Sequence, residues 1–248
     1  MPGHKATNAQ FSIMRTRYNL ARSHSTKESD VLEIACGSGI GLGYLSENAK
    51  KVVGGDIDAD LLSYAKKTYE GDSKVSVLEL DAHNLPFEDN SFDVVLIYEA
   101  IYYFPEIEKA FQEVNRVLRK GGKLIISTVN KDWHGFNPSP FSFKYYSHLE
   151  LEKLLTDGNF SIDAYCGFED LPKSSNFIAT SLKRIAVKLN LIPKTMKGKE
   201  FLKRVFYGKL SPLPNVLTDD IGELEKLVAI NASKKLINYK VLYYICEK

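Results

Sequence analysis

Residues 31–44, which read VLEIACGSGIGLGY, limit the folds open to this chain more than any other stretch. A short apolar run ends abruptly in glycines spaced Gly-x-Gly-x-Gly from Gly37, and a helix-like pattern follows. A buried strand that enters a helix through glycines leaves backbone N–H groups pointing outward, so a ligand can lie directly against the main chain. The dinucleotide-binding fingerprint Gly-x-Gly-x-x-Gly would need a further glycine where this chain has Leu42 or Tyr44. The turn therefore predicts a ligand site that departs from that fingerprint.

Strand-like apolar runs alternate with helical patterns along the chain, which is typical of a mostly parallel sheet with helices on both faces. The length of 248 residues is sufficient for one domain of this class. The sequence therefore predicts a doubly wound α/β fold made of residues 1–248 as a single domain. The expected strands are 31–35, 51–57, 75–80, 92–98, 123–129, 160–165 and 241–246, and the expected helices are 8–23, 41–48, 59–69, 107–118 and 148–156.

Acidic residues end two of these strands, at the sheet edge where open α/β sheets bind ligands. Asp56 ends the second strand, and a carboxylate there can accept hydrogen bonds from both ribose hydroxyls of an adenosine. Ile57, the next residue, would then lie against the adenine face. Folds that bind NAD also place an acid at the end of this strand, so Asp56 alone leaves both kinds of cofactor open.

Five ordered motifs between residues 31 and 129 resemble those of class I S-adenosylmethionine (SAM)-dependent methyltransferases, in particular the ubiquinone and menaquinone methyltransferase-like group. Residues 33–41 are similar to the family signature E/D-x-G-x-G-x-G, with Ala35 in place of its first glycine. The other four read VGGDID at 53–58, DAHNLPF at 81–87, NSFDVV at 90–95 and EVNRVLRKGGKL at 113–124. Dehydrogenases have no counterpart of the motif at 81–87.

The resemblance implies a seven-stranded sheet whose last strand runs antiparallel between the fifth and the sixth. It also implies SAM as cofactor and S-adenosyl-L-homocysteine as product. In such proteins the carboxylate at Asp81 accepts from the adenine amino group, and the backbone N–H at Ala82 reaches a ring nitrogen. The cofactor-binding residues expected from the resemblance are Tyr18, Glu33, Ala35, Gly37, Gly39, Asp56, Ile57, Asp81, Ala82, Tyr98 and Glu99.

Transfer of a methyl group from a sulfonium requires a nucleophile held in line at about 3 Å and the exclusion of water. A general base is needed only for an acceptor that is protonated at neutral pH. Aromatic residues crowd the segments after the fourth and fifth strands, which predicts an acceptor pocket with Tyr103 and His134 as the candidate catalytic groups. The family often has histidine where this chain has Tyr103, and a lone loop histidine is more often simply exposed. The aromatic residues are Tyr102, Tyr103, Phe104, Trp133, Phe136, Phe141, Phe143, Tyr145 and Tyr146.

Residues 169–235 form an insertion between the sixth and seventh strands. A connection between a parallel and an antiparallel strand emerges at the sheet edge where the cofactor binds, so we expect a helical lid over the site. Amphipathic patterns cover 175–189 and 200–210, and a third segment, 219–228, follows a capping residue, Thr218. Residues 171–215 hold ten basic residues and one acid, a net charge of +9 against −7 for the remainder. This asymmetry predicts a small or carrier-linked anionic acceptor, although lysines that are merely solvated would give the same pattern.

The three cysteines, Cys36, Cys166 and Cys246, lie far apart without metal-ligand spacing, so neither a metal site nor a disulfide framework is expected. No N-terminal apolar stretch resembles a signal peptide, and no apolar run approaches about 20 residues. We therefore expect a cytoplasmic protein without a transmembrane segment. Peripheral contact with a membrane surface and the oligomeric state stay open.

Three alternatives compete with an enzyme that methylates a small acceptor. An NAD(P)-dependent oxidoreductase is disfavoured by the glycine spacing and by residues 81–87. A methyltransferase-like scaffold or partner subunit would show a damaged cofactor motif, and this chain shows none. An RNA methyltransferase would suit the basic insertion, but no known RNA-reading motif accompanies it.

Overall fold

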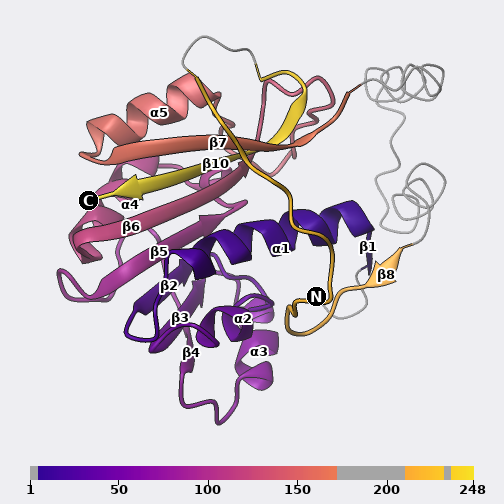
Figure 1. Ribbon diagram of the computed structural model, residues 1–248. Helices are drawn as coiled ribbons and strands as arrows, with labels where there is room; N and C mark the ends of the chain where they lie inside the picture. Colours follow the sequence, from indigo (N-terminus) through magenta and orange to yellow (C-terminus); the bar gives the residue numbers. More distant parts are fainter. Residues whose placement is uncertain (1–4, 172–209, 232–235) are drawn as a thin grey trace.

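The computed structural model describes residues 5–171, 210–231 and 236–248 (Figure 1). Its core is an eight-stranded sheet in the order β4-β3-β2-β5-β6-β10-β7-β9. Strands β4 to β6 pair in parallel, and β10 runs antiparallel between β6 and β7. This confirms the doubly wound fold and the place of its antiparallel last strand. The strand bounds are β2 Asp30–Ile34, β3 Lys51–Asp56, β4 Val75–Glu79, β5 Phe92–Tyr98, β6 Leu118–Val129, β7 Ser161–Glu169, β9 Val228–Ala229 and β10 Tyr239–Glu247.

Helices cover both faces of the sheet. The first three pack on one face with one apolar cluster, and α4 and α5 pack on the other face with a second cluster. The short helix η1 follows β5 directly. The helix bounds are α1 Asn8–Ser23, α2 Leu42–Ser46, α3 Ala59–Thr68, η1 Ile101–Tyr103, α4 Ile107–Val117 and α5 His148–Asp157.

Local capping explains where these helices begin. Thr7 and Gln10 form a capping box at the start of α1, and Ser147 and Glu150 form another at the start of α5. The Asp58 carboxylate accepts from the backbone N–H of Leu61 and caps α3. These caps place the helix starts where the sequence predicted them.

The end of α4 differs from the prediction. The helix stops at Val117, because Leu118 is already extended (ψ 137°) and opens β6. The sequence predicted a strand over 123–129, so β6 is longer at its start. Gly121 adopts the left-handed conformation (φ 76°) within β6.

Residues 210–231, called the strap here, lie alongside α1 (Figure 1). The predicted helix over 219–228 is wrong, because this segment consists of turns and extended chain. Its backbone N–H groups bond to α1 instead: Glu223 donates to Ser12 Oγ at 2.9 Å and Glu225 to Thr16 Oγ1 at 3.0 Å. Gly222 (φ +72°) allows the close approach, since a Cβ there would lie 2.6 Å from the Ser12 nitrogen.

Two short strands form a ribbon that the sequence did not predict. β1 (Lys5–Ala6) pairs antiparallel with β8 (Ser211–Pro212), which opens the strap. The predicted helix over 175–189 lies outside the described residues, and so does the one over 200–210 except for its last residue. The ten basic residues counted above also lie outside them. For residues 172–209 and 232–235 the lid therefore stays a prediction, whereas residues 210–231 lie along α1 as the strap.

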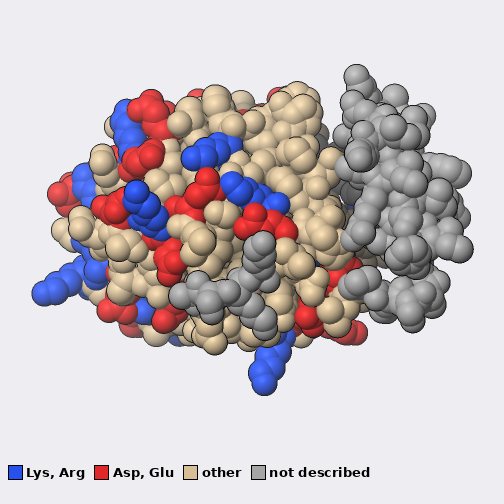
Figure 2. Space-filling model, turned by 90° about the horizontal axis from the view of Figure 1, so that it is seen from above, with Lys and Arg blue, Asp and Glu red and all other residues tan. Residues whose placement is uncertain are grey.

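The charge asymmetry predicted from the sequence is not tested by the described surface, because its ten basic residues lie outside the described residues. Figure 2 shows one face on which basic and acidic side chains lie close together. In the described parts of the chain, no helix combines the length and apolar character needed to cross a membrane. Those parts also contain no group of three or more His, Cys, Asp or Glu side chains able to hold a metal ion.

Candidate functional site

A cavity of about 700 Å³ lies at the carboxyl ends of β2, β3, β4 and β5. Nine of the thirteen residues predicted to bind the cofactor or to act in catalysis line it. It also takes in side chains from α3 and from the aromatic loops after β5 and β6. The lining residues are Ile34, Ala35, Gly37, Asp56, Ile57, Asp58, Leu61, Leu80, Asp81, Ala82, His83, Tyr98, Glu99, Ala100, Tyr103, Phe104, Pro105 and Phe143.

The glycine turn after β2 forms one wall of this cavity. Ala35, Gly37 and Gly39 all have left-handed backbone conformations, with φ of 59°, 58° and 75°. Ala35 occupies the place of the family's first glycine, and its positive φ is the conformation that glycine adopts without strain. Gly41 serves a different purpose, since a Cβ there would lie 1.9 Å from the Tyr18 ring. The turn is thus shaped by backbone requirements at three positions and by close packing at a fourth.

Asp56 joins the end of β3 to this turn. Its Oδ2 accepts from the backbone N–H of Gly37 at 2.7 Å, and its Oδ1 accepts from that of Asp58 at 2.9 Å. Each carboxylate oxygen can accept a further hydrogen bond. The two bonds therefore orient the carboxylate and leave it able to receive a pair of hydroxyl donors. Beside it, Ile57 is 72% exposed although it is a large apolar residue.

Asp81 follows β4, and its side chain is 54% exposed. Its Oδ1 accepts from the His83 backbone N–H at 2.9 Å and lies 2.6 Å from the His83 ring Nδ1. The hydrogen bond from the His83 backbone, with the one from its ring, lowers the pKa of Asp81. Oδ1 is thus engaged within the loop, whereas Oδ2 is left for a ligand donor. The opposite nitrogen of the His83 ring is buried without a partner among the described residues.

The loop that carries Asp81 is held in place by α4. Glu113 Oε2 accepts from the Leu85 backbone N–H at 2.8 Å. Arg116 donates to the carbonyls of Leu85 and Phe87 at 3.0 and 2.7 Å and pairs with Glu113. The motif at 113–124 therefore supports the motif at 81–87 through direct bonds, although the two lie far apart in the sequence.

Tyr18 and Glu33 lie behind the turn rather than in the cavity lining. The Tyr18 hydroxyl donates to Glu33 Oε1 at 2.5 Å, and Oε2 is buried without a partner among the described residues. Burial raises the pKa of Glu33 to about 7, against the opposing effects of the Tyr18 hydrogen bond and the Arg17 charge. These two residues therefore support the turn from outside the cavity, and Gly39, which is part of the turn, is likewise absent from the lining.

The end of β5 forms the wall opposite Asp81. Glu99 adopts a left-handed conformation (φ 52°) immediately after the strand, and its Oε2 accepts from the Tyr102 hydroxyl at 3.2 Å. Burial raises the pKa of Glu99, while the charge of Arg17 and the Tyr102 bond oppose the rise. A non-glycine residue in this conformation, at a ligand cavity, is a common feature of functional sites.

Arg17 is the residue that the sequence analysis missed. Its guanidinium carbon lies 5.4 Å from the ring centroids of both Tyr18 and Tyr98. Burial alone would lower the pKa of Arg17, but its negative neighbours, Glu99 and Glu33 among them, hold it above the ordinary value. Only its position beside Tyr18 on the first helix could have drawn attention to it. Arg17 is not among the lining residues, whereas His83, Leu80 and Pro105 line the cavity without having been predicted.

The two candidate catalytic residues occupy different surroundings. Tyr103 lines the cavity and is 44% exposed, next to Tyr102 in an edge-to-face contact. His134 does not line it: its backbone N–H donates to the Ile237 carbonyl at 2.9 Å, and its ring Nδ1 lies 3.0 Å from the same oxygen. Its Nε2 faces Asp170 at 3.7 Å. The structure thus brings Tyr103, and not His134, to the mouth of the cavity.

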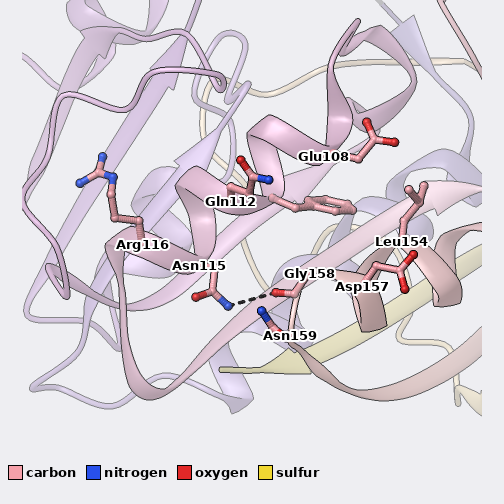
Figure 3. A pocket seen from close by; sticks show the side chains of 9 residues that line it. Glu108, Gln112, Asn115, Arg116, Leu154, Asp157, Gly158 and Asn159 are labelled. Atoms are coloured by element: carbon pink, nitrogen blue, oxygen red, sulfur yellow. Dashed lines mark hydrogen bonds between the residues drawn. The ribbon is translucent and has the colours of Figure 1, made fainter.

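A second cavity of about 450 Å³ lies between α4 and α5 (Figure 3). Asn115 spans it by donating to the Gly158 carbonyl at 3.2 Å. Arg116, at one end, is already occupied by the site loop and by Asp89. None of the predicted site residues lies in this cavity.

Comparisons with known proteins agree with this geometry. Residues 32–126 match the family model described as a methyltransferase domain. A probable S-adenosylmethionine-dependent methyltransferase of Mycobacterium tuberculosis is 31% identical over 150 residues, which cover 58% of this chain and 53% of that protein. A demethylmenaquinone methyltransferase of Clavibacter sepedonicus is 33% identical over 96 residues, covering 39% of each chain. This chain therefore spans about half the length, or less, of the curated relatives it matches.

The fold is shared more widely than the sequence. A SAM-dependent methyltransferase of Thermotoga maritima, described as a possible histamine N-methyltransferase, superposes with a TM-score of 0.59 at 18% identity. The match covers 97% of this chain and 92% of that one. The region that the family model matches runs from β2 to β6 and so includes every strand end that lines the cavity. Residues 32–126 therefore carry a methyltransferase domain, and over this region the chain is similar to S-adenosylmethionine-dependent methyltransferases, whose cofactor is SAM.

Proposed function

We propose that this protein transfers the methyl group of SAM to an oxygen, nitrogen or carbon atom of a small or carrier-linked anionic acceptor, by in-line displacement. One observation carries the proposal. A single cavity holds the oriented carboxylates of Asp56 and Asp81 beside the aromatic side chains of Tyr103, Phe104 and Phe143. Polar groups placed to orient a ligand within an apolar wall are what a two-substrate pocket requires.

The residues of the cavity fit the cofactor in three ways. The carboxylate of Asp56 suits a ribose diol, and the exposed Ile57 next to it offers an apolar surface for a purine ring. The free oxygen of Asp81 suits the adenine amino group. The left-handed turn from Ala35 to Gly39 leaves the backbone open to close approach.

In this account the protein mainly positions the two reactants. The bound sulfonium supplies an already activated methyl group. The chain's own residues hold the acceptor in line and keep water out, through the aromatic wall after β5 and β6. Tyr103 is the polar group of this wall nearest the cavity mouth. Burial, with a contribution from the nearby Tyr145 and Glu99, raises the pKa of its hydroxyl, so it acts as a hydrogen-bond donor at neutral pH.

Incubation with SAM that carries an isotopically labelled methyl group tests the transfer. The acceptors to compare are phosphate-bearing metabolites, nucleotide sugars, lipid-linked anionic intermediates and RNA. We expect labelled product from one of the first three classes, with release of S-adenosyl-L-homocysteine. Label in RNA alone would contradict the acceptor class, and binding of SAM without transfer to any of them would favour a scaffold role.

The anionic nature of the acceptor has its own test. Exposed charges are screened over about 8–10 Å at moderate salt, so the acceptor KM should rise several-fold with salt while SAM affinity stays constant. Reversal of Lys183, Arg184, Lys203 and Arg204 to Glu should reproduce the rise. A matched control reverses four exposed lysines elsewhere, Lys66, Lys67, Lys120 and Lys153. Equal effects of the two quadruple variants, or none, would show that the basic insertion does not contact the acceptor.

A further inference from the structure

The strap contacts the glycine turn at a point outside the cavity lining. The backbone N–H of Leu217 donates to the carbonyl of Ile40, between the last two glycines of the turn, at 2.8 Å. Leu217 is 1% exposed and belongs to the apolar cluster under the first three helices. Its neighbour Val216 lies so close to α2 that a Cβ at Gly43 would be 2.8 Å from its side chain. A segment from late in the chain therefore packs against the turn that forms one wall of the cavity.

Asp219 fastens this segment to two helices at once. Its Oδ1 accepts from the hydroxyl of Tyr44 on α2 at 2.8 Å. Arg15 and Arg22 of α1 approach the same carboxylate at 3.6 and 3.4 Å. The hydrogen bond from Tyr44 is the main cause of a lowered pKa at Asp219, and the charges of Arg22 and Arg15 add to it. The carboxylate is thus ionised at neutral pH, and it joins the strap, α1 and α2.

The turn and α2 depend on such outside support. Ala35, Gly37 and Gly39 hold left-handed conformations, which persist where the surrounding structure imposes them. The helix that follows has only five residues, and its N-cap, Gly41, has no side chain to bond its first N–H groups. A helix this short is not stable without tertiary contacts. The strap supplies contacts to both, at Ile40 and at Tyr44.

We propose that Asp219 is a positioning residue for the cofactor. By fastening the strap to α1 and α2, it holds the glycine turn in the conformation that receives SAM. Because binding free energies are reciprocal, a bound cofactor then stabilises the docked strap to the same extent. The inference rests on the proposed function, since it takes SAM to lie against this turn.

Calorimetric titration with S-adenosyl-L-homocysteine tests the role of Asp219. Asp219→Ala should weaken binding by about 3- to 10-fold, because the strap loses a charge-assisted hydrogen bond and two ion pairs. Asp219→Asn keeps an acceptor for the Tyr44 hydroxyl without the charge, so it should recover part of the loss. Tyr44→Phe removes the same hydrogen bond from its other end. Added to Asp219→Ala, it should weaken binding no further, since the two changes act on one bond.

Asp220→Ala is the matched control. Asp220 is also an aspartate of the strap, but the hydrogen bond that the structure gives its carboxylate comes from Thr218 of the strap itself. Its replacement should leave the affinity unchanged. Equal losses in Asp219→Ala and Asp220→Ala would point to the charge of the strap in general and overturn the inference. Parent-like affinity in both variants would overturn it as well.

Hydrogen exchange gives a second measurement, which holds even if Asp219→Ala does not fold. In the parent, S-adenosyl-L-homocysteine should slow exchange of the Leu217 N–H more than exchange in α5, which packs on the other face of the sheet. In Asp219→Asn this added protection should shrink. A merely structural role would instead speed exchange equally with and without the ligand. Exchange at Leu217 that the ligand does not slow in the parent would overturn the inference, whereas a parent that does not bind the nucleoside would refute the proposed function on which it rests.

Discussion

The Tyr18 hydroxyl donates a 2.5 Å hydrogen bond to Oε1 of Glu33, and this bond joins α1 to the strand that enters the glycine turn. Both side chains are almost fully buried, with exposures of 1% and 2%. The same Tyr18 ring occupies the space that a Cβ at Gly41 would need. The first helix and the turn thus fit together through one polar bond and one close contact.

Tyr18→Phe should destabilise the protein by about 1–3 kcal/mol, because Glu33 would lose its one described hydrogen-bond donor while remaining buried. The loss should be larger at pH 8, where Glu33 is ionised, than at pH 5, where it is protonated. Urea unfolding at the two pH values measures it. Tyr64→Phe, a change at a 44% exposed position on α3, is the control and should have no effect. A loss of stability that is the same at both pH values would contradict a stabilising bond from Tyr18 to the ionised Glu33 carboxylate.

The raised pKa of Glu33, about 7, predicts a specific pH dependence of stability. The unfolded chain releases this proton near pH 4.5, whereas the folded protein keeps it until about pH 7. The folded state binds more protons between these values, so the free energy of unfolding should fall as pH rises through this range and level off above it. The fall amounts to at most about 3 kcal/mol.

Glu33→Gln removes this titration, so its unfolding free energy should vary less between pH 5 and pH 8. Some decline should persist, because burial also raises the pKa of Glu99. Urea unfolding across the pH range measures both curves. Parallel curves for parent and variant would show that Glu33 does not titrate in this window.

The left-handed backbone at Ala35 predicts opposite results for two substitutions. Ala35→Gly should keep or raise stability slightly, since glycine adopts this conformation without strain. Ala35→Val should lose about 2 kcal/mol or more and bind SAM more weakly, because a β-branched residue strongly resists positive φ. Thermal unfolding and calorimetric titration check both variants. A valine variant as stable as the glycine variant would exclude this conformation at the turn.

The aromatic wall predicts a separation of catalysis from cofactor binding. The Tyr103→Ala/His134→Ala double variant should lose methyl transfer while SAM affinity stays close to that of the parent. Since only Tyr103 lines the cavity, Tyr103→Phe alone should account for most of the loss, and His134→Ala alone for little. Transfer rates and titrations of the three variants decide this. An equal fall in rate and affinity would indicate a structural role.

Much of the fold could be predicted because its signals are local. The alternation of apolar runs with helical patterns identified the seven long strands of the sheet, and the caps at Thr7, Asp58 and Ser147 fixed where three helices begin. The strap could not be predicted in this way. Its helical periodicity at 219–228 is outweighed by hydroxyls of α1, Ser12 and Thr16, which bond its backbone N–H groups. Those partners lie about two hundred residues away in the sequence.

The site residues fall into the same two groups, those that local motifs identify and those that only the packing brings together. Asp56, Asp81 and the glycines stand in motifs, so the sequence was sufficient to bring them together at the sheet edge. Arg17 stands in no motif, and its importance depends on rings and carboxylates that only the packing of α1 on β5 places around it. His134 shows the opposite case, because its position after a strand predicted a site residue, whereas the Ile237 carbonyl binds it outside the cavity.

The central claim is that the cavity at the strand ends binds SAM through Asp56, and calorimetric titration of the parent and of Asp56→Ala tests it most directly. The parent should bind SAM and S-adenosyl-L-homocysteine and should not bind NAD. Asp56→Ala should weaken SAM binding by about 10-fold or more, since two charge-assisted hydrogen bonds to the ribose contribute about 1.5–3 kcal/mol each. An Asp56→Ala variant that binds SAM as tightly as the parent, or a parent that binds NAD instead, would contradict the account.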